Sequence, residues 1–240
     1  MKLSIVIPIF NEEKTVAQVL KEVDDVVIPD VKKEIIVVND ASGDKTGEIL
    51  KTLAKKYKDL VIITHEKNKG KGAAVRTGFA QATGDYIVIQ DADLEYDPNY
   101  LKKLIKPILE GKTQVVYGTR LKQLPRLEGH GTMPKSRFLL HFFGNRFLSL
   151  ITSVLYLQWI TDMETCYKIF PREFLSKVTL HGQGFNFEPE ITAKLIKAGY
   201  KIVELPITTK PRGYDEGKKL QTVPEGIEAV KTLFRYRFSE

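Results

Sequence analysis

The chain has almost no cysteine and lacks a long uncharged apolar segment, and these absences narrow its class. Cys166 is the only cysteine among 240 residues, which excludes an internal disulfide and fits a reducing compartment. We expect its thiol to behave as a small buried hydrophobe. In the most apolar region, 138–160, the side chains of His141, Asn145 and Arg146 interrupt the run. Since a membrane-spanning helix needs ~20 residues with few or no charges, a span is not expected here.

Two common phosphate-binding motifs are also missing. Gly70-Lys71-Gly72 fails the dinucleotide-binding pattern, because Val75 stands where the third glycine should be. The segment fails the P-loop pattern as well, since it has no GK[ST]. The glycines still let the backbone approach a phosphate or ribose, and Lys71 supplies a positive charge. We therefore expect neither a dinucleotide site nor an ATPase site.

The charge balance points to an anionic partner. The formal net charge is +7 with a pI near 9.2, which is typical of proteins that bind a nucleotide, a phosphate or an acidic lipid. A generally basic surface would give the same balance. Nucleic acid is not expected, because no basic–aromatic motif accompanies the charge. The apolar run 5–8 is too short for a signal peptide, so we expect a cytoplasmic protein.

Strand and helix patterns alternate along the first half of the chain. The strands lack an in/out alternation, which indicates burial on both faces. Asn11 can cap the first helix, with Glu12 and Glu13 in its first turn. The pattern predicts an α/β fold with a mostly parallel central sheet and helices on both faces. The expected strands are 3–9, 34–38, 60–63, 86–90 and 114–120, with helical spacing around 16–23, 49–57, 73–82 and 101–108.

The second half begins with a long loop, 121–134, a length that is usually functional or mobile. The region 138–160 has a wide apolar face and a basic polar stripe, which fits either a helix at a membrane interface or a helix packed on the core. Further along we expect a strand ending near Phe170, a helix within 186–199 and a strand at 200–207. A basic loop and a final amphipathic helix starting at Pro224 complete the chain.

Two carboxylates follow the apolar run 86–89. Asp91 and Asp93 are separated by one small residue, and Glu95 adds a third carboxylate nearby. Ligands bind at the carboxyl ends of strands in open α/β sheets, and an Asp-x-Asp there can hold a hard divalent cation. Asp-rich turns without a metal have the same composition, so this motif does not decide the matter alone.

Four loops after strands are expected to converge on this edge: 8–11, 40–44, 68–72 and 91–93. Asp40 could accept hydrogen bonds from a base N–H or a ribose hydroxyl. A helix-capping turn is the other interpretation of its loop, and Asp44 fits that role better.

The order of these motifs resembles the inverting glycosyltransferases of the GT-A fold, family 2. Within that family the chain is most similar to dolichol-phosphate mannose synthases and other polyprenyl-phosphate glycosyltransferases. The resemblance implies a GT-A (Rossmann-like) fold with C-terminal amphipathic helices. The motifs that carry it are Ser4–Glu12, Val37–Thr46, Asn68–Gly72, Gln90–Pro98 and Tyr117–Arg120.

The resemblance also implies roles for individual residues. Asp91 and Asp93 match the metal motif for Mg²⁺ or Mn²⁺, with Glu95 as a further ligand, and both aspartates are counted as catalytic. For any single arginine among the acceptor-phosphate positions given next, a solvated surface charge is the other interpretation. The nucleotide-binding positions are Pro8, Phe10, Glu12, Asp40, Lys71 and Asp91, and the acceptor-phosphate positions are Arg120, Arg137, Arg212 and Lys218.

The expected reaction is metal-dependent, inverting transfer of a sugar from GDP-mannose or a UDP-sugar to a polyprenyl (dolichyl-type) phosphate. A phosphate acceptor is already anionic and needs no general base, whereas a hydroxyl acceptor needs one, for which Asp162 or Glu164 is the candidate. A soluble family 2 enzyme acting on a hydroxyl in polysaccharide or glycolipid synthesis is the alternative. A non-catalytic nucleotide-sugar-binding module is the alternative from another class.

We expect one catalytic domain, 1–240, with a nucleotide-sugar-binding half at 1–120 and an acceptor-binding half at 121–240. Many polyprenyl-phosphate enzymes continue into transmembrane helices, whereas this sequence ends at Glu240 after a basic amphipathic helix. We expect peripheral attachment to the cytoplasmic face of the membrane. A membrane-anchoring protein partner, a soluble acceptor, or a sequence that is part of a longer protein would also account for this ending.

Overall fold

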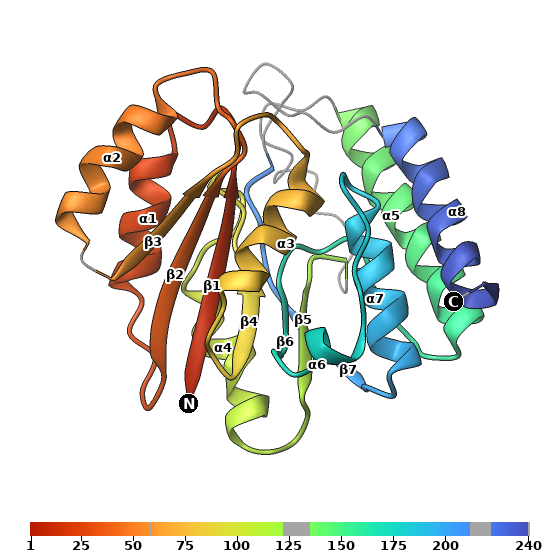
Figure 1. The fold of residues 1–240 in the computed structure, drawn as a ribbon. Helices are drawn as coiled ribbons and strands as arrows, with labels where there is room; N and C mark the ends of the chain where they lie inside the picture. The colour runs from red at the N-terminus through yellow and green to blue at the C-terminus, as the bar shows by residue number, and fades with distance from the viewer. Residues whose placement is uncertain (58, 122–134, 212–221, 240) are drawn as a thin grey trace.

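The computed structural model describes residues 1–57, 59–121, 135–211 and 222–239. Within these residues seven strands form one sheet in the order β3-β2-β1-β4-β6-β5-β7 (Figure 1). All of them run in the same direction except β6. The strands are β1 (Lys2–Ile9), β2 (Lys32–Asn39), β3 (Leu60–Thr64), β4 (Tyr86–Ile89), β5 (Val115–Thr119), β6 (Lys168–Pro171) and β7 (Ile202–Pro206).

The central strands are apolar and buried on both faces, as parallel pairing requires. On β1 the side chain of Ile5 is fully buried and pairs with Ile35 of β2 on one side and with Val88 of β4 on the other. The chain order therefore reverses at β1, since β2 and β3 lie to one side and β4 to the other. Such a reversal opens a crevice at the carboxyl ends of the strands.

Helices cover both faces of the sheet, which confirms the predicted architecture. In Figure 1 α3 lies in front of the strands and contacts β1 and β2, while α4 lies behind them and contacts β5. The helices α5, α7 and α8 contact one another and stand together at the right of the view. The helices are α1 (Val16–Asp25), α2 (Thr46–Lys56), α3 (Lys71–Gln81), α4 (Tyr100–Leu109), α5 (Lys135–Tyr156), α6 (Phe174–Lys177), α7 (Phe187–Lys197) and α8 (Thr222–Phe238).

The start of α1 differs from the expectation. The helix begins at Val16 with Thr15 at its N-cap, so the prediction that Asn11 caps it is wrong. Asn11 has a φ of 52° and joins the loop after β2: its N–H donates to Ser42 Oγ at 2.9 Å, and its Oδ1 accepts from the Gly43 N–H at 2.8 Å. The residues after β1 therefore bind a neighbouring loop before the helix starts.

The long helix α5 presents its apolar side outward. Its hydroxyl-bearing residues Ser149, Thr152 and Ser153 are buried against the protein. By length and composition Phe138–Tyr156 could cross a membrane, with a mean hydropathy of 1.4, although core helices of soluble proteins meet the same criterion. The exposed side forms an apolar stripe of Leu140, Phe143, Phe147, Leu150 and Val154.

Candidate active site

The carboxyl ends of six parallel strands and the start of β6 meet at one edge of the sheet. This edge therefore gathers residues that are far apart in sequence. The loops after β1, β2, β3, β4 and β5 contribute Phe10, Asp40, His65, Asp91 and Arg120, respectively. Pro8 and Phe10, predicted to contact the nucleotide, are half-buried at the end of β1.

The loops after β1 and β2 are joined by reciprocal hydrogen bonds. Glu12 N–H donates to Thr46 Oγ1 at 2.9 Å, and in the other direction the Lys45 N–H donates to Glu13 Oε2 at 3.0 Å. Asp44 Oδ1 accepts from the Thr46 N–H at 2.9 Å, but the N-cap position of α2 is Lys45, so the prediction that Asp44 caps this helix is off by one residue. Backbone and side-chain bonds thus fix the shape of this part of the edge.

Both carboxylate oxygens of Asp40 have hydrogen-bond partners within the protein. Asp40 is 2% exposed; its Oδ1 lies 2.6 Å from His65 Nδ1 and accepts from the Lys69 N–H at 2.9 Å. Its Oδ2 accepts from the Gly70 N–H at 2.8 Å, and His65 Nε2 lies 2.9 Å from Thr77 Oγ1. Asp40 therefore holds the loop that carries Lys71. Nucleotide binding by Asp40 stays a prediction.

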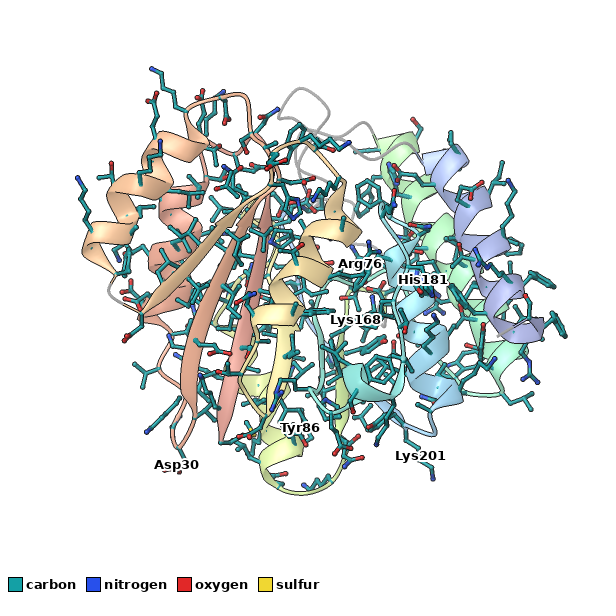
Figure 2. The ribbon with its side chains drawn as sticks, viewed as in Figure 1. Asp30, Arg76, Tyr86, Lys168, His181 and Lys201 are labelled. Atoms are coloured by element: carbon teal, nitrogen blue, oxygen red, sulfur yellow. The ribbon has the colours of Figure 1, made fainter. Side chains whose placement is uncertain are left out.

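The two glycines beside Lys71 are explained by a close approach of another loop. A Cβ on Gly72 would lie 2.4 Å from the carbonyl oxygen of Gly182, and Gly70 has a φ of 87°. Arg76 of α3 donates to the same Gly182 carbonyl, and Figure 2 shows Arg76 and His181 beside each other between α3 and α7. Glu190 Oε1 accepts from the His181 N–H at 2.8 Å. The segment before α7 thus clamps the start of α3.

Asp91 faces a cationic side chain. Lys71 Nζ lies 2.8 Å from Asp91 Oδ1 and 3.6 Å from Glu188 Oε1. Burial alone would lower the pKa of Lys71, but the charges of Asp91 and Glu188 outweigh it and hold that pKa well above its usual value. Asp93 Oδ1 accepts from the Glu95 N–H at 3.0 Å, so these three predicted metal-site residues share one turn.

The loop that carries Asp91 is fixed from below. Gln90 is fully buried; its Nε2 donates to the Asp91 and Tyr96 carbonyls at 3.0 and 3.2 Å, and its Oε1 accepts from Tyr167 Oη at 2.6 Å. The backbone N–H of Cys166 donates to Tyr96 Oη at 3.1 Å. Cys166 is buried and free, as predicted, and burial raises the pKa of its thiol.

The donor set fits a divalent cation that is shared with a substrate. Among the described residues no group of three or more His, Cys, Asp or Glu side chains is arranged to hold a metal. Mg²⁺ is usually bound by one or two carboxylates together with substrate phosphates and water rather than by an all-protein cage. Asp91 and Asp93 supply such oxygens, and the ammonium group on Asp91 shows that this carboxylate faces a cation.

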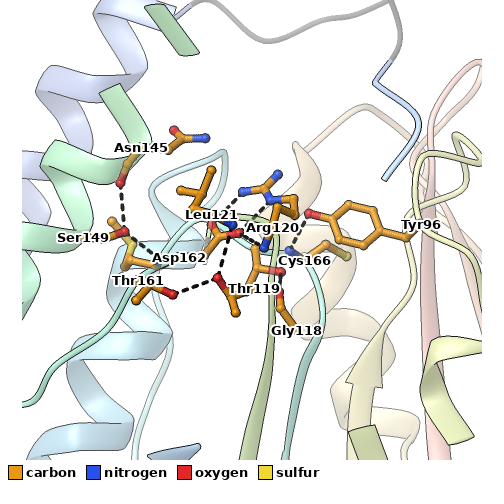
Figure 3. A network of polar contacts seen from close by, with 12 residues as sticks. Tyr96, Gly118, Thr119, Arg120, Leu121, Asn145, Ser149, Thr161, Asp162 and Cys166 are labelled. Carbon is orange, nitrogen blue, oxygen red and sulfur yellow. Dashed lines mark hydrogen bonds and ion pairs between the residues drawn. The ribbon is translucent and has the colours of Figure 1, made fainter. Parts of the chain in front are cut away.

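Arg120 and Asp162 form a bidentate pair (Figure 3). Arg120 Nε and Nη2 each lie 2.8 Å from an oxygen of Asp162, and the Arg120 N–H donates to Asp162 Oδ2 at 2.8 Å. Asp162 is fully buried, and the guanidinium carbon lies 5.8 Å from the centre of the Tyr96 ring. The pair fixes the guanidinium group, whose Nη1 has no acceptor among the described residues.

Two further glutamates, Glu164 and Glu188, lie near the Lys71–Asp91 and Arg120–Asp162 pairs. Burial raises the pKa of Glu164 to about 7, and its buried Oε1 has no hydrogen-bond partner among the described residues. Glu188 pairs through Oε2 with the fully buried Lys168. Sequence reasoning missed Glu188, Lys168 and His65. A lysine within a buried strand was the available signal, because lysine is almost never fully buried unless it is paired.

Comparison with known proteins identifies the family. The family model described as "Glycosyl transferase family 2" matches residues 4–179. The chain belongs to glycosyl transferase family 2. This confirms the resemblance predicted from the motifs.

The chain is similar to several curated proteins. It is 32% identical to a dolichol-phosphate mannosyltransferase of Pyrococcus furiosus, over 98% of this chain and 64% of that protein. It is 31% identical to a dolichyl-phosphate β-glucosyltransferase of Trichomonas vaginalis, over 85% of this chain and 64% of that protein. An uncharacterized protein of Methanocaldococcus jannaschii is 29% identical over 98% of this chain and 99% of its own length. The chain thus spans just under two thirds of the two named transferases.

Solved structures support the GT-A fold. Glucosyl-3-phosphoglycerate synthase of Mycobacterium tuberculosis superposes with a TM-score of 0.69 at 20% identity, covering 99% of this chain and 81% of that one. A structure of that enzyme with Mn²⁺, UDP-glucose and phosphoglyceric acid gives a TM-score of 0.67 at 21% identity, covering 98% and 79%. At this identity the likeness concerns the fold alone.

Three predicted acceptor residues of this family 2 glycosyltransferase cannot be placed at the site. Arg212 and Lys218 lie outside the described residues. Arg137 belongs to the backbone of α5, but its side chain is outside the described part. Arg120 is the member of the predicted acceptor set whose side-chain contacts are described.

Proposed function

We propose that this glycosyltransferase moves a sugar, with inversion, from a nucleotide sugar such as GDP-mannose or a UDP-sugar to a polyprenyl phosphate. One observation carries the proposal: an acidic turn with Asp91 and Asp93 and a fixed arginine, Arg120, follow β4 and β5 at the same edge. The acidic turn suits a cation-bound diphosphate, and the guanidinium group suits a phosphate. The similarity to a dolichol-phosphate mannosyltransferase supports this choice of acceptor.

A Mg²⁺ or Mn²⁺ ion on Asp91 and Asp93 would neutralise the diphosphate of the departing nucleotide. The remaining chemistry belongs to the chain. Lys71 adds positive charge beside Asp91, and Arg120 presents its unengaged Nη1 to the acceptor phosphate. Positioning of the two anions next to each other is the main task, because a phosphate oxygen attacks the donor C1 without losing a proton.

The contacts of Asp162 favour a phosphate acceptor over a hydroxyl acceptor. A hydroxyl acceptor needs a carboxylate that can take its proton. Both oxygens of Asp162 are bound to Arg120, and the residue is fully buried, which fits a positioning role better than a general base. Glu164, with its raised pKa, is the residue that the hydroxyl alternative would use.

The test is transfer from a panel of radiolabelled GDP- and UDP-sugars to a short polyprenyl phosphate, with Mg²⁺, Mn²⁺ or EDTA. Asp91→Asn should lower kcat/KM by about a thousandfold, or ~4 kcal/mol of transition-state stabilisation. Asp97→Asn is the matched control, because Asp97 is an exposed aspartate two residues beyond Glu95. Transfer to hydroxyl acceptors alone, or full activity in EDTA, would refute the proposal.

We also propose that the protein docks on an acidic membrane surface through the apolar stripe of α5 and the adjoining exposed side of α8. Phe143 and Phe147 are each 60% exposed, and Phe238 of α8 is 74% exposed. Lys231 and Arg237 are exposed on the same helix α8, and cations beside an apolar face suit anionic lipid. The comparisons give no support for a membrane-anchoring protein partner.

Co-sedimentation with phosphatidylcholine vesicles, with and without phosphatidylglycerol, measures this docking. Replacing Phe143 and Phe147 by serine should weaken vesicle binding by at least about tenfold, because both rings leave the lipid interface. Leu109→Ser is the control, since Leu109 of α4 is 45% exposed but lies away from the stripe. Concentration-dependent dimerisation that the two serines abolish, without vesicle binding, would assign the stripe to a second copy instead.

A further inference from the structure

The ammonium group of Lys71 lies between two carboxylates: it is hydrogen-bonded to Asp91 but not to Glu188. It lies 2.8 Å from Asp91 Oδ1 and 3.1 Å from Asp91 Oδ2, which are hydrogen-bonding distances. Its distance to Glu188 Oε1 is 3.6 Å, and that oxygen is buried without a hydrogen bond. Glu188 is 3% exposed, so water does not supply the missing bond at its surface.

The other side of Glu188 is already satisfied. Its Oε2 pairs with Lys168, a fully buried lysine whose Nζ also donates to the Thr165 carbonyl at 2.5 Å. Lys168 therefore fixes the carboxylate of Glu188 through Oε2, while Oε1 lies 3.6 Å from Lys71 Nζ. A buried acceptor with no donor is rare in folded proteins, and here it lies within an ångström of forming its bond.

We propose that Lys71 is a resident counter-ion that occupies Asp91 until a divalent cation binds there, and that Glu188 then receives the displaced ammonium group. The inference rests on the proposed function only in requiring a cation at Asp91.

Electrostatics supports an exchange of this kind. A divalent cation bonded to Asp91 and an ammonium group on the same carboxylate would repel each other at close range. Asp91 and Lys71 are 19% and 21% exposed, so a cation can reach them from solvent, whereas Glu188 lies deeper. A shift of Nζ by less than about 1 Å would complete the Glu188 hydrogen bond. Lys71 then stays charged and paired in both states.

The experiment measures Mn²⁺ binding by the electron paramagnetic resonance signal of the free ion, without a sugar donor and again with GDP or UDP. Lys71→Met should raise Mn²⁺ affinity by about tenfold, because no ammonium group competes for Asp91. Lys69→Met is the control: it removes an exposed lysine from the same loop and should leave the affinity nearly unchanged. A fall or no change in affinity for Lys71→Met would overturn the proposal.

Glu188→Gln tests the second part. It should lower Mn²⁺ affinity severalfold in the wild-type background but much less in the Lys71→Met background, because Glu188 acts through Lys71. Equal losses in both backgrounds would mean that Glu188 acts on the cation by charge alone. Where Glu188→Gln fails to fold, a crystal structure of the wild type with Mn²⁺ and UDP decides, since Lys71 Nζ must lie within hydrogen-bond distance of Glu188 Oε1. These measurements need no turnover, so their failure is separate from a failure of sugar transfer.

Discussion

Two carboxylates of the site edge, Asp91 and Glu188, have partners of a different kind from those of the carboxylates after β1 and β2. After β1 and β2, the carboxylates of Glu13, Asp40 and Asp44 accept hydrogen bonds from backbone N–H groups of neighbouring loops. After β4, Asp91 pairs instead with the ammonium group of Lys71, and Glu188 of α7 keeps one oxygen without a hydrogen bond. A backbone N–H cannot leave, whereas a lysine side chain can exchange with a ligand.

This difference separates shape from charge. Carboxylates that accept hydrogen bonds from backbone N–H groups hold the loops in a fixed shape. Side-chain ion pairs near the surface can exchange partners when a cation or a phosphate binds. We therefore expect substitution of Asp40 to act mainly on the free energy of unfolding, and substitutions of Asp91 and Lys71 to act mainly on ligand binding.

The largest expected effect on stability comes from Asp40→Asn. In the wild type, N–H donors such as that of Gly70 bind the carboxylate oxygens of Asp40. Asparagine replaces one of these oxygens with an NH₂ group, which cannot accept a hydrogen bond. Leaving buried donors unpaired should lower the free energy of unfolding by about 3 kcal/mol, measured by urea denaturation. Asp24→Asn, at an exposed aspartate of α1, should change it by no more than ~0.5 kcal/mol.

The same variant sharpens the comparison, because Asp40 is also predicted to contact the nucleotide. Binding of GDP and UDP is measured well below the melting temperature. A loss of affinity larger than that of a second loop variant, His65→Ala, would assign the carboxylate a direct contact with the ligand. Equal losses for the two variants would show that Asp40 acts through the loop.

The next effect is the pH dependence that Glu164 confers. Burial raises the pKa of Glu164 to about 7 from its usual 4.5, so the folded protein holds this proton more tightly than the unfolded chain. The stabilisation is present at low pH and is lost as pH rises from about 4.5 to about 7. The wild type should lose up to ~3 kcal/mol across this window relative to Glu164→Gln, measured by urea denaturation in EDTA.

Two other carboxylates calibrate this measurement. Burial also raises the pKa of Glu204, so part of the same slope persists in Glu164→Gln. Glu34 has its pKa lowered to about 2, against the effect of burial, by hydrogen bonds from Lys2, Ser4 and Thr83, and loses its stabilisation only in acid. If the free energies of unfolding of the wild type and Glu164→Gln change in parallel from pH 5 to pH 7, the pKa of Glu164 is not raised by burial and this prediction is wrong.

The fold was accessible from the sequence because its signals are local. Apolar runs such as 86–89 and the helical repeats between them need no knowledge of distant contacts, and the turn residues after each strand mark the functional edge. The start of α1 was missed because Asn11 binds Ser42 and Gly43, and such a bond between loops leaves no trace in spacing.

Partners across the site were not accessible for the same reason. The pairing of Lys71 with Asp91 and Glu188 joins three positions that are far apart in sequence. The glycines of 70–72 are consistent in sequence with a close phosphate, but in the structure the segment 182–183 approaches them closely. The outward-facing apolar side of α5 also depends on which face meets α7 and α8, and periodicity does not decide that.

The smallest expected effect tests whether Arg120 binds the acceptor. Arg120→Lys keeps the charge but loses the bidentate geometry, so the KM for polyprenyl phosphate should rise about tenfold while nucleotide affinity is unchanged. Asp162→Asn should also act on KM, because Asp162 fixes the guanidinium group. Arg172→Lys is the control, since Arg172 donates to the Gly84 carbonyl at the opposite edge of the sheet. A collapse of kcat in Asp162→Asn at saturating acceptor, with KM unchanged, would instead make Asp162 a general base and favour a hydroxyl acceptor.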